Sequence, residues 1–289
     1  MIYGNCQVSS WAEVLPVLNT SISVLEYALV THESSSTYLT SLKMKNPDAI
    51  LVMTSLEQQL NISKEIKNVT TAPIIFIPNI TCNVFHPDIS YVFNKGKVLQ
   101  NVLGGDWNSR IMAEGFRIGL TFDSISQALN DEFLYEKAGY FEYWNEFIEN
   151  STVDFELCEI DFFGWLSKVR QYGNFMHGIN HPKLIAVGAL AEPVVEKLGL
   201  KSQDFSVVDE LCSDPLADSV WPVSPLIAEY FGLKQSNLVR FNGEVMDFEN
   251  FIMTTLNLWR LDTTIKNKYT VWPQIIEFSK IMKRATYVK

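Results

Sequence analysis

The first eighty residues alternate between short apolar runs and segments with helical character. The apolar runs that predict strands are Met1–Tyr3, Ile22–Val30, Asp48–Thr54 and Pro73–Ile77. The segments that predict helices lie between them, at Val8–Leu18, Ser34–Lys45 and Asn61–Asn68. Strands separated by helices favour a parallel sheet, because each parallel connection must cross over the sheet. We therefore predict an α/β fold that begins with a Rossmann-like, doubly wound parallel sheet.

Beyond Trp107 the hydrophobic pattern becomes mainly helical. Helices are predicted at Arg110–Leu120, Thr121–Leu129, Leu134–Ile148, Gly164–Val169, Leu184–Leu198, Phe248–Leu261 and Trp272–Arg284. No internal repeat and no linker rich in Gly, Ser or Pro separates the two parts of the chain. We expect a single domain over residues 1–289, with an α/β sheet core in 1–105 and a largely helical part, 106–289, packed on it.

Charge and cysteine spacing exclude several classes of function. The formal net charge of −10 argues against a nucleic-acid partner, since that binding depends on clustered Lys and Arg. The four cysteines are widely spaced and include no C-x-x-C pair, so neither a zinc site nor a disulfide scaffold is expected. Neither a signal peptide nor a transmembrane run is recognised, and we expect a cytoplasmic protein.

The tetrapeptide Gly4-Asn5-Cys6-Gln7 falls between the first predicted strand and the first predicted helix. The unpaired N–H groups and the dipole at a helix N-terminus favour thiolate over thiol, which makes Cys6 a candidate nucleophile with a lowered pKa. Gly4 permits a sharp reversal, while the Asn5 amide and the N–H groups of Cys6 and Gln7 are candidate donors to an oxyanion. The alternative is that Cys6 is a small residue filling a strand–helix corner.

Two of the four histidines, His86 and His181, directly precede proline. Proline holds the preceding residue in an extended conformation, so each imidazole has a restricted reach and is a candidate general base. The alternative is a loop histidine bonded to backbone, and the sequence does not select the base. His177 and His181 are poorly spaced for a metal site because a Gly and a Pro interrupt any helix there. His32 is expected at the surface.

Positive charge follows His86 in an otherwise acidic chain. Lys95, Lys97, Arg110 and Arg117 are candidates for holding phosphate groups. The alternative for each residue alone is ordinary solvated surface charge.

The chain resembles the WcbI-type polysaccharide-biosynthesis proteins of bacterial capsule loci. The resemblance rests on four segments in the same order, within Met1–Leu233: Tyr3–Gln7, Phe85–Asp88, Ile111–Leu129 and Asn180–Pro182. It implies an acetyltransferase that binds coenzyme A and modifies a capsular sugar. The co-substrate would be coenzyme A or acetyl-coenzyme A without a metal, and the acceptor a nucleotide-sugar, a sugar phosphate or a polysaccharide.

The resemblance also implies roles for individual residues. Cys6, Asn5, His86 and His181 are expected to be catalytic. Cofactor binding is expected of Gly4 and Gln7. The four basic residues named above are also expected to bind the cofactor, because they are the positive charges nearest the proposed site in the sequence. Asn180 and Asp88, which lie in the two histidine–proline segments, are expected to bind substrate.

Three functions remain open from the sequence. The first is acyl transfer from a coenzyme A thioester to a sugar hydroxyl, either through an acylated Cys6 or directly. The second is an esterase or thioesterase that uses the same site, with water as acceptor. The third is a non-catalytic sugar-binding or assembly protein, for which the 18 Phe, 11 Tyr and 7 Trp would supply stacking surfaces.

Overall fold

The computed structural model describes residues 1–29, 35–55, 62–262, 265, 270–272 and 278–284. His32 lies outside the described residues. The contacts within the chain define two compact units. Unit 1 comprises residues 1–81, 148–176 and 180–217, and unit 2 comprises residues 82–147, 177–179 and 218–289. Segments after residue 147 belong to the same unit as the N-terminal sheet, so the units do not divide near residue 105. A single domain over residues 1–289 remains a prediction.

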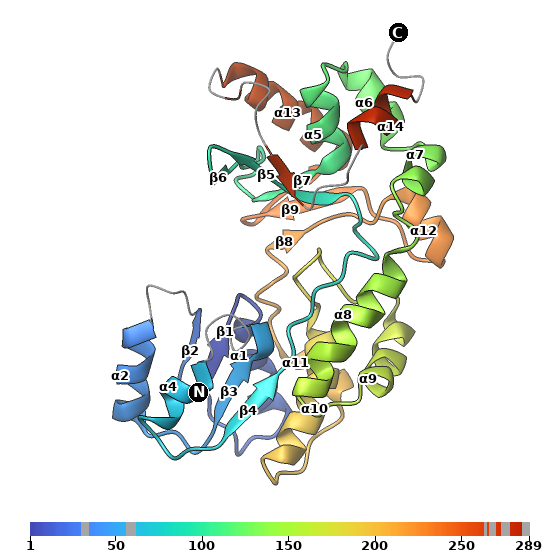
Figure 1. Ribbon diagram of the computed structural model, residues 1–289. Coiled ribbons are helices and arrows are strands. Elements are labelled where there is room, and N and C mark those ends of the chain that lie inside the picture. The colour runs from blue at the N-terminus through green and yellow to red at the C-terminus, as the bar shows by residue number, and fades with distance from the viewer. Residues whose placement is uncertain (30–34, 56–61, 263–264, 266–269, 273–277, 285–289) are drawn as a thin grey trace. The chain divides into compact units, whose positions relative to one another are not determined.

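Unit 1 contains the N-terminal sheet and the helices that cover it (Figure 1). Its elements are β1 (Ile2–Gly4), α1 (Val8–Leu18), β2 (Tyr27–Leu29), α2 (Ser35–Lys45), β3 (Ile50–Met53), α4 (Ile62–Lys67), β4 (Ile74–Ile77), α9 (Phe162–Val169), the 3₁₀ helix η1 (Arg170–Tyr172), α10 (Leu184–Lys197), the 3₁₀ helix η2 (Phe205–Val207) and α11 (Val208–Leu211). The boundary at residues 147 and 148 falls within α8 (Tyr143–Leu157).

The sheet of unit 1 has the strand order β2-β1-β3-β4, and every pairing is parallel. This confirms the predicted α/β fold class. Alternate side chains face opposite layers, as the pleat of a strand requires. Tyr3 and Val52 pack in one core with Tyr38 of α2 and Ile66 of α4. The α2 and α4 helices therefore cover one face of the sheet.

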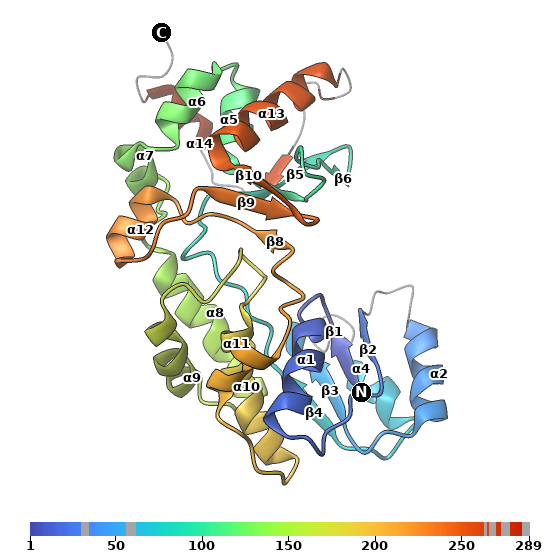
Figure 2. The same ribbon diagram turned by 180° about the vertical axis from the view of Figure 1, so that it is seen from behind.

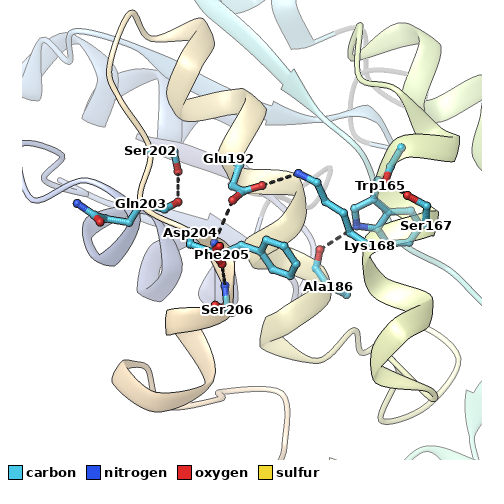
Figure 3. A network of polar contacts seen from close by, with 11 residues as sticks. Trp165, Ser167, Lys168, Ala186, Glu192, Ser202, Gln203, Asp204, Phe205 and Ser206 are labelled. Atoms are coloured by element: carbon cyan, nitrogen blue, oxygen red, sulfur yellow. Dashed lines mark hydrogen bonds and ion pairs between the residues drawn. The ribbon is translucent and has the colours of Figure 1, made fainter.

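The opposite face of this sheet is covered by α1, which packs against α10. A polar network then ties α10 to its neighbours (Figure 3). The carboxylate of Glu192 lies 2.6 Å from Lys168 Nζ of α9 and accepts the N–H of Phe205 at 3.0 Å. The indole of Trp165 donates to the Ala186 carbonyl at 3.0 Å. These bonds fix α10, whose N-terminus follows the segment that carries His181.

Unit 2 combines short strands with helices. Its elements are β5 (Ile89–Asn94), β6 (Lys97–Val98), β7 (Trp107–Ser109), α5 (Arg110–Arg117), α6 (Phe122–Ala128), α7 (Glu132–Lys137), β8 (Ser219–Val220), α12 (Pro225–Phe231), β9 (Leu238–Phe241), β10 (Glu244–Asp247), α13 (Phe248–Leu261), β11 (Thr270–Trp272) and α14 (Phe278–Arg284). The α5 helix packs against β5 and β7 and also contacts α6, α13 and α14.

The expectation of a largely helical second part omitted two antiparallel sheets. One has the order β11-β5-β6 with β7 paired to β5, and the other has the order β10-β9-β8 (Figure 2). Their hairpin turns, Lys95-Gly96 and Asn242-Gly243, have positive φ at both residues. Asn-Gly is a strong hairpin signal, but the strands around it have only four residues each, too few for a clear pattern.

Helix boundaries also differ from the prediction in this part of the chain. The single helix expected at Leu134–Ile148 is divided into α7 and α8, because Gly139 with φ +71° ends the first helix. None of the helices in the described part of the chain has the length and apolar character needed to cross a membrane.

Candidate functional site

Gly4 ends β1 and begins the turn that carries Cys6. A Cβ at this position would lie 2.8 Å from both Met53 Cβ and Val8 Cγ1. The turn therefore packs against β3 and the first residue of α1 so closely that a larger side chain does not fit. The sequence predicted glycine here for a sharp backbone reversal, whereas the structure requires it for close packing.

Asn5 shapes the turn between β1 and α1. Its Oδ1 accepts the backbone N–H of Gln7 at 3.0 Å, and its backbone carbonyl accepts the N–H of Val8 at 3.1 Å. Its Nδ2 donates to Asn79 Oδ1 at 2.7 Å. Because the side chain is held at both ends, Asn5 has a positioning role here. Its predicted contact with an oxyanion remains a prediction.

Gln7 is fully buried, and its amide joins three segments of unit 1. Nε2 donates to Ile80 O at 2.8 Å, to Asn79 Oδ1 at 3.1 Å and to Asn180 O at 3.1 Å. Oε1 accepts the N–H of Ile80 at 3.1 Å. Both ends of the amide are therefore hydrogen-bonded within the protein. The cofactor-binding role predicted for Gln7 is untested, and its amide already serves to hold the turn to two other loops.

Cys6 lies in this turn and is half-buried. Burial raises the pKa of its thiol, and backbone N–H groups of Cys6 and Gln7 lower it by less. The predicted lowering of the Cys6 pKa is therefore wrong, because loss of hydration outweighs the helix N-terminus. Burial also raises the pKa of Cys82 and of Cys158, in each case to about 12. A base must therefore take the Cys6 proton before its sulfur attacks.

His181 follows the Asn180 carbonyl that Gln7 binds, and it is half-buried. Pro182 forms a β-bridge with Met176, which fixes the backbone on the far side of the histidine. The Cys6 turn and the His181 loop, 175 positions apart by residue number (181 − 6), are thus brought together within unit 1 through one side chain. A catalytic role for Cys6 and His181 together remains a prediction.

His86 belongs to unit 2 and is buried. Its N–H donates to Asn83 O at 3.1 Å, and its carbonyl accepts the N–H of Ile89 at 3.2 Å. The backbone around His86 is therefore a closed turn that leads directly into β5. Its role as a catalytic base remains a prediction.

Asp88 is also buried in unit 2, at the start of β5. Its Oδ1 accepts the N–H of Ile111 at 2.9 Å and the Tyr140 hydroxyl at 3.2 Å. Its Oδ2 has no hydrogen-bond partner among the described residues. Burial raises the pKa of Asp88 to about 6, despite the opposing effects of the Ser109 hydroxyl, the Ile111 N–H, Arg110 and Tyr140.

The four predicted phosphate-binding residues all belong to unit 2 and have unlike surroundings. Arg110 is 1% exposed and lies over the Phe278 ring at 5.9 Å. Arg117 donates to the Glu114 carboxylate through Nε at 2.8 Å and Nη2 at 2.5 Å. Arg110 is buried and Arg117 is ion-paired, so neither presents the exposed charge that was expected of a phosphate-binding residue. The exposed Lys95 lies in a hairpin turn and the exposed Lys97 directly follows that turn; their phosphate role remains a prediction.

Asn79 is a site residue that the sequence analysis did not assign. It contacts both Asn5 and Gln7, and its own Nδ2 donates to Thr81 Oγ1 at 3.2 Å. Asn79 could have been found from its place just after β4. The carboxyl ends of parallel strands lie at one sheet edge, so this position is at the same edge as the Cys6 turn. Among the described residues, His, Cys, Asp and Glu side chains form no group of three suited to a metal ion.

Comparison with known proteins identifies the family. The model of the family described as polysaccharide biosynthesis enzyme WcbI matches residues 1–203. The search of curated proteins finds no match. A solved structure of WcbI, described as a novel polysaccharide biosynthesis enzyme, has a TM-score of 0.69 and 15% identity over 99% of this chain and 95% of that chain. It is described as the native protein without a disulfide bond between COA and one of its cysteines. With the family model covering most of its length, this chain belongs to the WcbI family of polysaccharide biosynthesis enzymes.

Proposed function

We propose that this enzyme transfers an acyl group from a coenzyme A thioester to a sugar hydroxyl at the Cys6 turn. The observation that carries the proposal is a half-buried thiol at the carboxyl end of β1, held beside the His181 loop by Gln7. Ligands of parallel α/β sheets bind at this edge. Membership of a polysaccharide biosynthesis family supports a sugar as the acceptor.

The WcbI structure supports coenzyme A as the acyl donor, because that protein is distinguished by the lack of a disulfide bond between COA and one of its cysteines. A disulfide between that cysteine and coenzyme A would require their two sulfur atoms to come within about 2.05 Å of each other. The acyl carbonyl of a thioester is bonded to the coenzyme A sulfur. If Cys6 corresponds to this cysteine, the reacting carbonyl carbon lies within its reach.

In the covalent route, Cys6 Sγ attacks the thioester carbonyl while His181 takes the thiol proton. The carbon–sulfur bond to coenzyme A then breaks, and His181 returns the proton to the leaving sulfur. A sugar hydroxyl next attacks the acylated Cys6, its proton passes to His181, and the bond to Sγ breaks as that sulfur regains a proton. Because burial raises the pKa of Cys6, the base is essential to the first step.

In the direct route, His181 takes the proton of the sugar hydroxyl, which attacks the thioester without an acylated enzyme. The raised pKa of Cys6 is compatible with this route as well, because the thiol then serves only to position the donor. Esterase or thioesterase action differs from both routes in using water as the acceptor.

Rapid-quench kinetics with radiolabelled acetyl-coenzyme A separates these routes. The covalent route predicts a burst of one acetyl group per active site on the wild type, and none on Cys6→Ala. His181→Gln should reduce the burst rate by about 10²-fold to 10⁴-fold, the usual contribution of general base catalysis. Release of coenzyme A that does not depend on an added sugar would identify a hydrolase. If neither labelled enzyme nor coenzyme A release is found with any acceptor, the proposed acyl transfer is wrong.

A further inference from the structure

Unit 2 contains a cavity of about 260 Å³ whose lining residues all belong to that unit. It is bordered by residues of α6, of α13 and of the segments around Trp221 and Asn237. Cavities that hold drug-sized ligands run from about 300 Å³ upward, so this one suits a smaller ligand with a single ring. It is too small to enclose coenzyme A.

One part of the cavity lining is aromatic. Phe122, Trp221 and Phe248 are among the lining residues, and the rings of Trp221 and Phe248 meet edge to face at 5.4 Å. The backbone N–H of Trp221 is held by the His177 carbonyl at 2.8 Å, which fixes this side of the cavity. Such rings offer a rigid apolar surface, which suits the C–H face of a sugar ring.

The remaining lining is rich in groups that hydrogen-bond. Gln235, Asn237 and Ser126 are among the lining residues. Their side chains are amides and a hydroxyl, which both donate and accept hydrogen bonds. The Asn237 carbonyl accepts the N–H of Phe248 at 2.7 Å, so the loop that carries these amides is tied to the start of α13. A ligand with several hydroxyl groups around an apolar ring matches this combination.

Charge in the cavity selects against anions. Its lining includes the carboxylates of Asp88 and Glu249, and none of the described residues that line it is lysine or arginine. The Oδ2 atom of Asp88 is buried and has no hydrogen-bond partner among the described residues. A phosphate in this cavity would face like charge from the two acidic lining residues.

We propose that this cavity binds an uncharged sugar residue. Its C–H face packs on Trp221 and Phe248, and its hydroxyl groups bond to the Asn237 amide and the Asp88 carboxylate. Of a nucleotide-sugar or a sugar phosphate, only the neutral sugar ring enters this cavity, and the charged groups stay outside it. The proposal concerns binding, and it stands whether or not Cys6 takes part in acyl transfer.

Saturation-transfer NMR on the whole protein tests the proposal without coenzyme A. The probes are the methyl glycosides of glucose, galactose, mannose and N-acetylglucosamine at millimolar concentration. We expect at least one of them to bind the wild type. Ser126→Trp fills the cavity and should abolish that binding, whereas Gln127→Trp places the same ring at an exposed position of α6 outside the lining and should not. Melting curves show whether both variants fold.

If Ser126→Trp does not fold, Asn237→Ala replaces it in the test. The Asn237 side chain is exposed, and its removal leaves the hydrogen bond from the Phe248 N–H to the Asn237 carbonyl in place. It should weaken binding about tenfold, the effect of one or two lost hydrogen bonds. The proposal is overturned if no glycoside binds, or if the cavity variant binds as well as Gln127→Trp.

Charge provides an independent arm of the test. Glucose 6-phosphate should bind more weakly than methyl glucoside, and Glu249→Gln should narrow that difference. Glu244→Gln, the same change at an exposed position of β10 outside the lining, should leave the difference unchanged. Tighter binding of the phosphate than of the neutral glycoside would also overturn the proposal, because the carboxylates of the lining oppose it.

Discussion

The side-chain amide of Gln7 donates to the backbone carbonyl of Asn180 at 3.1 Å, across 173 positions of sequence. The same amide also bonds to the loop that follows β4. One buried side chain therefore holds together the turn with the candidate nucleophile and the loop with a candidate base. The geometry of the candidate site depends on Gln7 even though its amide is not exposed to a ligand.

Replacing Gln7 with Leu should destabilise the protein by about 2–4 kcal/mol, because it leaves the Ile80 N–H and the Ile80 and Asn180 carbonyls without their partner. Urea unfolding followed by circular dichroism measures this change. Gln171→Leu is the matched control, because Gln171 is exposed and makes a single bond to Ser167 O. Equal stability of the two variants would contradict the role assigned to Gln7.

The parallel sheet could be predicted because each of its strands is a continuous apolar run between helices. The positions of Cys6 and Asn79 at one sheet edge follow from that topology. The hydrogen bonds that the Gln7 amide makes to two other loops could not be predicted. A glutamine after a cysteine has no local sequence pattern that distinguishes burial from exposure. Its three partners come from segments far along the chain.

Unit 2 was harder to predict for a related reason. Its strands have two to six residues and pair across long intervals, as β11 does with β5. The burial of Arg110 could not be predicted from the sequence either, since arginine is almost never fully buried. The strand pairing in unit 2 and the burial of Arg110 are both determined by tertiary packing, which no local sequence pattern reveals.

Gly4→Ala should lower stability by about 1–3 kcal/mol, because the added Cβ would lie 2.8 Å from atoms of both Met53 and Val8. The clash displaces the start of α1 relative to β3, so acyl transfer should fall by more than the loss of folded protein explains. Thermal unfolding and activity at a temperature well below the transition give the two values. A variant as stable and active as the wild type would show that the turn accommodates a Cβ at position 4, which would contradict the close packing described above.

Cys6 should react slowly with iodoacetamide at pH 7, since burial raises its pKa. Its rate should continue to rise with pH past about 8.5, the usual pKa of a free cysteine. Peptide mass spectrometry on the folded protein separates Cys6 from Cys212, which is also half-buried, and from the two buried cysteines. A plateau in the Cys6 rate below pH 8 would mean that a neighbouring group stabilises the thiolate more than burial opposes it.

Asp88 should make the folded protein less stable as the pH rises through the acid range. Burial raises its pKa from 3.8 to about 6, so between these values the folded state binds a proton that the unfolded state releases. Stability from this group is present below pH 3.8 and is lost as the pH rises to about 6. A shift of this size corresponds to roughly 3 kcal/mol in the free energy of unfolding.

The Asp88→Asn variant isolates this effect. It keeps the acceptor for Ile111 and Tyr140 but does not titrate, so the pH profile of wild-type stability minus that of the variant reports on Asp88. Urea unfolding from pH 4 to pH 7 should show this difference falling, and a constant or rising difference would mean that Asp88 is charged throughout the range.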